Sequence, residues 1–313
     1  MSDRRLQIAH ACAVISLLLA LPLAACTSSA SGTGPASEPP PASLPVAHEI
    51  PDLLDSATLQ LPLDSYLPTI EQVNQRAAAQ RLLIRRCMLR FGVRITLPEP
   101  PTNVGLKTQN ERRYGLTDAA AAATIGYGLG DRDPRLHPDG REKATKLAGR
   151  SLAVLTGEGS DLPRGLPAGG CSGEVNQQLT PVDPGTHQAL NENLPQGLSM
   201  ESFGRSQEDP RVQAAFSKWS SCMSAKNHQY RTPLEPPADP AFVKAGSAQE
   251  RQTAQDDVAC KASTNLVGTW FPVESAYQTM LIGEHRDELA ALQQGNAVVR
   301  KLVLSLPLPK QSG

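Results

Sequence analysis

Aromatic residues are scarce in this 313-residue chain, at 4% of the sequence. Few large rings limit the apolar area that a core can bury, so covalent cross-links matter more for the stability of a folded domain. An excess of positive charge is also missing, because 30 Lys and Arg stand against 31 Asp and Glu. We therefore expect no nucleic-acid partner, since binding to phosphates needs a basic surface.

Catalytic and metal-binding motifs are missing as well. The chain has no Cys-x-x-Cys, His-Glu-x-x-His or Gly-x-Ser-x-Gly pattern. The glycines at 126–130 follow a predicted helix, whereas a phosphate-binding loop follows a strand. His285 lies beside Glu284, Asp287 and Glu288, a grouping more typical of an exposed charged helix face than of a metal site. The sequence thus predicts no catalytic residues, no metal and no cofactor.

The N-terminus has the pattern of a bacterial lipoprotein precursor. Arg4 and Arg5 precede an apolar run from Ile8 to Leu21, too short to span a membrane, and the run leads to Leu23-Ala24-Ala25-Cys26. This lipobox predicts that residues 1–25 are a signal peptide and that Cys26 carries the lipid. Two acyl chains would anchor the protein to the cell membrane on its extracytoplasmic side.

The mature chain divides into a tether and a folded domain. Residues 27–48 are rich in Ser, Pro, Gly and Ala and bury too little apolar surface to fold. We expect residues 26–48 to be the lipidated cysteine and a disordered tether, and residues 49–313 to be one helical domain.

Four cysteines remain once Cys12 in the signal peptide and Cys26 are set aside: Cys87, Cys171, Cys222 and Cys260. Disulfides persist outside the cytoplasm, and four cysteines allow three pairings. A loose internal repeat, Cys-Met-x-x-x-Gly/Asn with a later Cys-x-x-x-x-Asn, favours nearest neighbours, namely Cys87 with Cys171 and Cys222 with Cys260. It also raises the hypothesis of two related halves, 68–180 and 207–306.

Helix signals dominate the domain, so the predicted class is mainly α, a disulfide-stapled helical domain with long loops and a long C-terminal helix. Thr69 to Gln72 and Ser247 to Glu250 match capping boxes, and Asp209-Pro210 is typical of a helix start. The helix that begins after Ser247 should be kinked or restarted by Pro272. Apolar residues at near-heptad spacing then predict one helix from Val273 to about Leu304.

Two apolar features allow either a structural or a binding interpretation. Trp219, Trp270 and Tyr230 could line a ligand groove, although their spacing favours the core. The apolar tail at 298–308 could fold back on the arm at 49–67, or it could form an exposed seam for a partner.

Several blocks carry a family resemblance: Arg112-Arg113-Tyr114-Gly115, Asp209-Pro210-Arg211-Val212, Trp219 to Met223 and Asn265 to Trp270. With these blocks the mature chain resembles a family of uncharacterised secreted lipoproteins of Streptomyces-like actinobacteria. The resemblance implies no activity and no catalytic residues.

The sequence therefore predicts a membrane-anchored extracytoplasmic lipoprotein that acts as a non-catalytic binding or scaffolding component of the cell envelope. Its expected partners are the membrane, through the lipid, and an envelope protein, while the sequence names no ligand. A solute-binding lipoprotein of a transporter is one alternative, and a cell-wall hydrolase is another.

Overall fold

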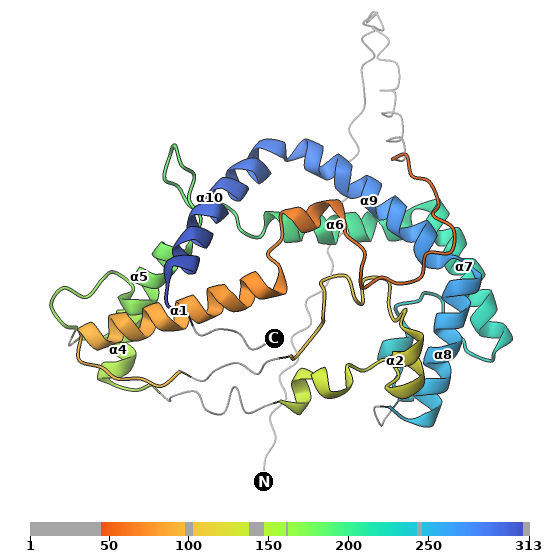
Figure 1. Ribbon diagram of the computed structural model, residues 1–313, viewed down its shortest axis with the longest axis horizontal. Helices are drawn as coiled ribbons and strands as arrows, with labels where there is room; N and C mark the ends of the chain where they lie inside the picture. Colours follow the sequence, from red (N-terminus) through yellow and green to blue (C-terminus); the bar gives the residue numbers. More distant parts are fainter. Residues whose placement is uncertain (1–44, 98–102, 138–146, 161, 243–245, 309–313) are drawn as a thin grey trace, which may run out of the picture. The chain divides into compact units, whose positions relative to one another are not determined.

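The computed structural model describes residues 45–97, 103–137, 147–160, 162–242 and 246–308. These residues are mainly helical (Figure 1), and β pairing among them is confined to an isolated antiparallel bridge between Val182 and Ala189. The predicted fold class, mainly α and stapled by disulfides, is confirmed. Cys26, the signal peptide and nearly all of the tether lie outside the described residues.

The helical elements follow one another along the chain with 3-10 turns between them. In chain order they are η1 (Pro62–Ser65), α1 (Ile70–Arg90), α2 (Ala119–Thr124), η2 (Gly130–Arg132), η3 (Pro134–Leu136), α4 (Arg150–Thr156), α5 (Gly170–Leu179), α6 (Leu194–Glu208), α7 (Pro210–Ala225), η4 (Pro236–Ala238), α8 (Ala248–Ser263), α9 (Leu266–Glu284) and α10 (Arg286–Ser305).

The predicted caps start three of these helices. At α1, the Thr69 hydroxyl accepts the Gln72 backbone N–H at 3.2 Å, and the Thr69 N–H donates to Gln72 Oε1 at 3.0 Å. Ser247 accepts the Glu250 N–H at 3.2 Å to start α8, but the predicted box is only half formed, because the Glu250 carboxylate accepts the Gly246 N–H instead of that of Ser247. Asp209 caps α7. Each cap satisfies amides that the first helical turn leaves unpaired.

Two helices end in the same way. Gly92 follows α1 with a φ of +73°, and Asn227 follows α7 with a φ of +66°. In both cases the next residue donates its N–H back to a methionine carbonyl, Val93 to Met88 and His228 to Met223, each at 3.0 Å. This left-handed stop is the one that glycine and asparagine provide most readily.

The predicted helix from Val273 to Leu304 is two helices. Glu284 ends α9, His285 takes a φ of −112°, and Arg286 begins α10. The earlier break also differs from the prediction, because α8 ends at Ser263 and Asn265 takes a φ of +48°, while Pro272 lies inside α9. The break at His285 allows α9 to pack on α6 and α7 while α10 packs on α1 (Figure 1).

Pro272 is tolerated inside α9 because the N-terminal arm replaces the hydrogen bond that a proline cannot make. Proline has no N–H for the carbonyl four residues earlier, and that carbonyl, of Gly268, accepts the Ile50 N–H at 2.8 Å instead. Gly268 also allows the close approach, since a Cβ there would lie 1.9 Å from the Ile50 carbonyl oxygen. Asn265 Nδ2 donates to that oxygen at 3.0 Å. The arm is thus bound to α9.

The helices form two packing regions. The aromatic region comprises α2, α6, α7, α8 and α9, whose core contains Tyr114, Phe216, Trp219, Trp270 and Tyr277. The aliphatic region comprises α1, α4, α5 and α10, and its buried residues include Ala79, Met88, Val154, Val175, Leu179, Val299 and Val303. In this region α10, from the hypothetical half at 207–306, packs with α1 and α5 from the half at 68–180.

Each region contains one disulfide. Cys87 bonds Cys171 and joins α1 to α5, with the Cα atoms 5.6 Å apart. Cys222 bonds Cys260 and joins α7 to α8, with the Cα atoms 5.7 Å apart. These are the two pairs that the repeat favours.

The C-terminal tail is partly buried, although not as the fold-back interpretation expects, while Val298 and Leu304 of the tail stay 65% and 59% exposed. Leu302, Leu306 and Leu308 pack beside Val299 and Val303 against α1 and α5, not against the arm at 49–67. Most of the apolar stripe is therefore covered by the aliphatic region.

Candidate functional site

The histidines of the described residues do not converge on one site. His285 Nδ1 lies 2.6 Å from Glu288 Oε2 at the start of α10, and His228 Nε2 lies 3.1 Å from Asp256 Oδ2. Each carboxylate pairs with a single histidine, and His48, His137 and His187 are exposed elsewhere. Within the part of the chain that the structure describes, no three His, Cys, Asp or Glu side chains are placed to hold a metal ion.

Trp219 and Trp270 belong to the core. Both are fully buried, and their ring nitrogens are committed, Trp219 Nε1 to Asp257 at 2.9 Å and Trp270 Nε1 to the Ser206 hydroxyl at 2.8 Å. Trp270 also packs against Phe216 in an edge-on arrangement, with 4.8 Å between ring centroids. The faces of these rings are therefore not available to a ligand.

Two buried ionic networks brace the aromatic region. Lys261 Nζ donates to Asp257 Oδ2 at 2.8 Å and to the Leu116 carbonyl at 2.9 Å, with both charged side chains fully buried. Burial raises the pKa of Asp257 and lowers that of Lys261, although each partner opposes the other's shift. The groups that bond to Lys261 and Asp257 all lie inside the fold, so we assign this ion pair a structural role.

The second network surrounds Glu274, whose side chain has no exposed surface. Its carboxylate accepts hydrogen bonds from Arg113, from the Tyr114 hydroxyl at 2.9 Å and from Gln278 at 3.0 Å. Burial, followed by the charge of Glu274, raises the pKa of Tyr114 well above its usual range. These contacts tie the 103–117 segment to α9.

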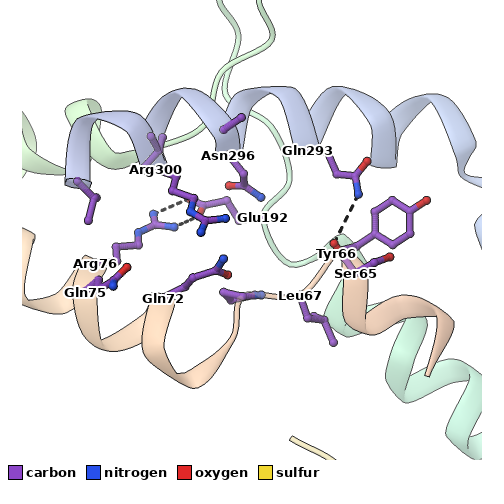
Figure 2. Close-up of a pocket in the computed structure, with 14 residues that line it drawn as sticks. Ser65, Tyr66, Leu67, Gln72, Gln75, Arg76, Glu192, Gln293, Asn296 and Arg300 are labelled. Carbon is purple, nitrogen blue, oxygen red and sulfur yellow. Dashed lines mark hydrogen bonds and ion pairs between the residues drawn. The ribbon is translucent and has the colours of Figure 1, made fainter. Parts of the chain in front are cut away.

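A groove between α1 and α10, lined by both apolar and polar side chains, is the candidate functional site. It has a volume of about 390 Å³, within the range of small-molecule sites, and Figure 2 shows its two helical walls. Its lining residues are Ser65, Tyr66, Leu67, Pro68, Gln72, Gln75, Arg76, Glu192, Gln293, Asn296, Ala297, Val299, Arg300 and Val303.

One end of the groove is held by Arg76. Its guanidinium pairs with both oxygens of Glu192 and donates to the Leu179 carbonyl at 2.8 Å. This fork ties α1 to the end of α5 and to the segment before α6. Arg76 and Glu192 therefore form part of the wall of the groove, and their charges neutralise each other.

Arg300 is placed differently. It lies on the exposed side of α10 and forms no ion pair or hydrogen bond with any residue that the structure describes. Figure 2 shows its guanidinium extending from α10 across the groove, beside the Arg76 and Glu192 pair and toward the side-chain amide of Gln72. At the other end, Gln293 Nε2 donates to the Ser65 carbonyl at 3.5 Å.

Sequence reasoning missed this groove, although two stripes signalled it. Gln72, Gln75 and Arg76 have helical spacing on α1, as do Gln293, Asn296 and Arg300 on α10. Residues three and four apart share a helix face, so each stripe could have been recognised as an amide and arginine face. The sequence does not show that the two faces meet.

Comparisons with known proteins add no assignment: no protein-family model, no curated protein and no solved structure matches the chain. Among the described residues, no helix has the length and apolar character needed to cross a membrane.

Proposed function

We propose that this chain is a lipid-anchored extracytoplasmic protein that binds a ligand in the groove between α1 and α10 and catalyses no reaction on it. The lipobox at Cys26 supports the anchor. The two disulfides support a compartment in which thiols are oxidised. The expected role as a binding component of the cell envelope thereby acquires a specific site.

The composition of the groove carries the proposal. Its ionisable side chains are Arg76, Glu192, Arg300 and Tyr66, and the only carboxylate among them pairs with Arg76. Ser65 donates its hydroxyl to the Pro62 carbonyl at 3.1 Å, and among the described residues that line the groove there is no histidine to activate it. Such a site offers hydrogen bonds and charge, which serve recognition, rather than a nucleophile with its base.

A solute-binding lipoprotein of a transporter is the second candidate, because the volume of the groove suits a small solute as well as a segment of a partner. The described residues contain no sheet of the kind that builds the usual two α/β lobes of such proteins. We therefore place this role second.

The anchor is tested by Cys26→Ser. This variant should lose incorporation of labelled fatty acid and should leave the membrane fraction. Full labelling of the variant would contradict the anchor.

Ligand binding is tested by a photoreactive amino acid placed in cells at Asn296, in the groove. Val298 on the same helix is 65% exposed and does not line the groove, so it serves as the control position. Adducts formed at Asn296 and not at Val298, identified by mass spectrometry, would support the proposal. Equal adducts at both positions, or none at Asn296, would contradict it.

A further inference from the structure

The charge of the groove restricts what it can hold. Arg76 and Arg300 contribute two positive charges and Glu192 one negative charge, so the lining carries one net positive charge. Because Arg76 and Glu192 are paired with each other, this charge is localised at Arg300. An arginine binds a carboxylate or phosphate oxyanion through paired N–H donors. A single such arginine suits a group with one negative charge.

The amides of the groove can be sorted by the atoms that they have already committed. Gln72 accepts through Oε1 from the Thr69 N–H, so its amino group stays available as a donor. Gln293 donates through Nε2 to Ser65, so its carbonyl oxygen stays available as an acceptor. Gln75 likewise donates to Glu71 at 2.8 Å and retains its carbonyl oxygen. Each amide thus keeps one group wholly uncommitted, while its committed group retains one further N–H or lone pair.

These roles give the groove a direction. Figure 2 shows the side chains of Arg300 and Gln72 pointing toward each other beside the Arg76 and Glu192 pair, and both residues line the groove. Together their N–H groups can donate to an oxyanion. Gln293 lies nearer the start of α10 than Arg300 does. Its available carbonyl oxygen can accept from a hydroxyl or an amide N–H of the ligand. Asn296, between Gln293 and Arg300 on this face, can donate and accept.

We infer that the groove binds a small molecule with one carboxylate, held by Arg300 and Gln72, and with hydroxyl or amide N–H groups that reach Gln293. This inference rests on the proposed binding function and names the class of its ligand. Sugar acids and short peptides with a free C-terminus share this chemistry. A phosphate ester with a second negative charge would fit less well, because Arg76 is committed to Glu192.

The test is calorimetric titration of the full chain carrying Cys26→Ser, with probes paired to differ in one group. Glucuronate is compared with glucose, and N-acetyl-alanyl-alanine with its C-terminal amide. Glucose 6-phosphate tests the phosphate. In at least one of the two pairs, the probe with the carboxylate should bind at least about tenfold more tightly than its neutral counterpart, because the neutral probe cannot form the charged hydrogen bond. The pair that responds identifies the source of the carboxylate.

Arg300→Gln should abolish this preference, while Arg300→Lys should retain part of it, because lysine keeps the charge without the planar fork. Arg286→Gln removes the same charge from an exposed position on α10 outside the groove and should change nothing. Circular dichroism melting of each variant separates loss of binding from loss of fold.

Three outcomes would overturn the inference: equal binding of charged and neutral probes, a preference that survives Arg300→Gln, or tighter binding of glucose 6-phosphate than of the carboxylates. If none of the probes binds while Asn296 still forms specific adducts in cells, the ligand class is wrong and the binding function stands. If the probes fail and the adducts are absent too, both are wrong.

Discussion

The aromatic and aliphatic regions each contain one disulfide whose first cysteine precedes a left-handed helix stop, Asn227 and Gly92 respectively, yet they are stabilised by different means. The aromatic region buries Trp219 and Trp270 completely and adds the ionic networks around Asp257 and Glu274. The aliphatic region buries mostly smaller side chains, and its disulfide closes a separation of 84 residues rather than 38. A region with less apolar area to bury depends more on its cross-link.

The groove lies in the aliphatic region, which has fewer stabilising contacts than the aromatic region. Its walls are α1 and α10, and the Arg76 and Glu192 pair that holds α1 to the segment before α6 is partly exposed, with 39% and 32% of the two side chains accessible. Exposed ion pairs contribute little to stability. We interpret the aromatic region as the stable support and the aliphatic region as the part that can adjust to a ligand.

Removal of the disulfides should lower the free energy of unfolding more than any other change proposed below. Replacing Cys87 and Cys171 by alanine should lower the free energy of unfolding by up to about 4.6 kcal/mol, and replacing Cys222 and Cys260 by up to about 3.9 kcal/mol. Urea unfolding of both variants without reductant measures the two losses. A larger loss from the Cys222 and Cys260 variant would contradict the greater dependence of the aliphatic region on its cross-link.

Lys261→Met should be the most damaging single change in the aromatic region, at about 4 kcal/mol, because it leaves the Asp257 charge buried without its partner. The double variant with Asp257→Asn should lose less, since neither charge then remains. Lys226→Met is the matched control: its pair with Asp256 is 40% exposed on the lysine side and should be worth under about 1 kcal/mol. Equal losses from Lys226→Met and Lys261→Met would refute the assignment.

Acid should weaken the contacts around Glu111. Hydrogen bonds from Arg132, at 2.6 and 3.0 Å, hold the pKa of Glu111 below its ordinary value of 4.5. The carboxylate therefore stabilises the fold above pH 4.5, and this stabilisation is lost as the pH falls through the lowered pKa. Glu111→Gln should cost about 1 kcal/mol at pH 7. The unfolding free energy of the Glu111→Gln variant should then fall less steeply with acid than that of the unchanged chain. An identical pH profile would count against a stabilising contact between Glu111 and Arg132.

Substitutions at the left-handed helix stops should change the free energy of unfolding least. A Cβ at Gly92 would meet no atom within 4 Å, so Gly92→Ala should cost about 1 kcal/mol through its left-handed backbone alone. Gly197 in α6 also has open space but no positive φ, so Gly197→Ala should stabilise the helix by a similar amount. Asn227→Gly should raise stability by a few tenths of a kcal/mol. If both Gly→Ala variants shifted urea unfolding in the same direction, the backbone argument would fail.

The repeat in the sequence led to the observed disulfide pairs, but only half of it has a structural counterpart. Cys87 and Cys222 both lie one turn before a left-handed stop. Their partners differ, because Cys171 lies at the start of α5 and Cys260 near the end of α8. Asn176 is helical, whereas Asn265 has a φ of +48°. The shared spacing of the two asparagines therefore reflects no common geometry.

Local sequence determined the features that depend on a few adjacent residues. The caps at Thr69, Ser247 and Asp209 and the stops at Gly92 and Asn227 are such features, because each is a hydrogen bond or a backbone conformation within one helical turn. The mainly α class follows from their sum.

Tertiary structure alone decided how distant segments meet. Pro272 reads locally as a helix break, yet it lies inside α9 because Ile50, far away in the chain, bonds the carbonyl that it frees. The stripes on α1 and α10 read locally as two solvated faces, and they form a groove only because the break at His285 brings α10 to α1. Packing energy is shared among residues far apart in sequence, so no single stretch of the chain contains it.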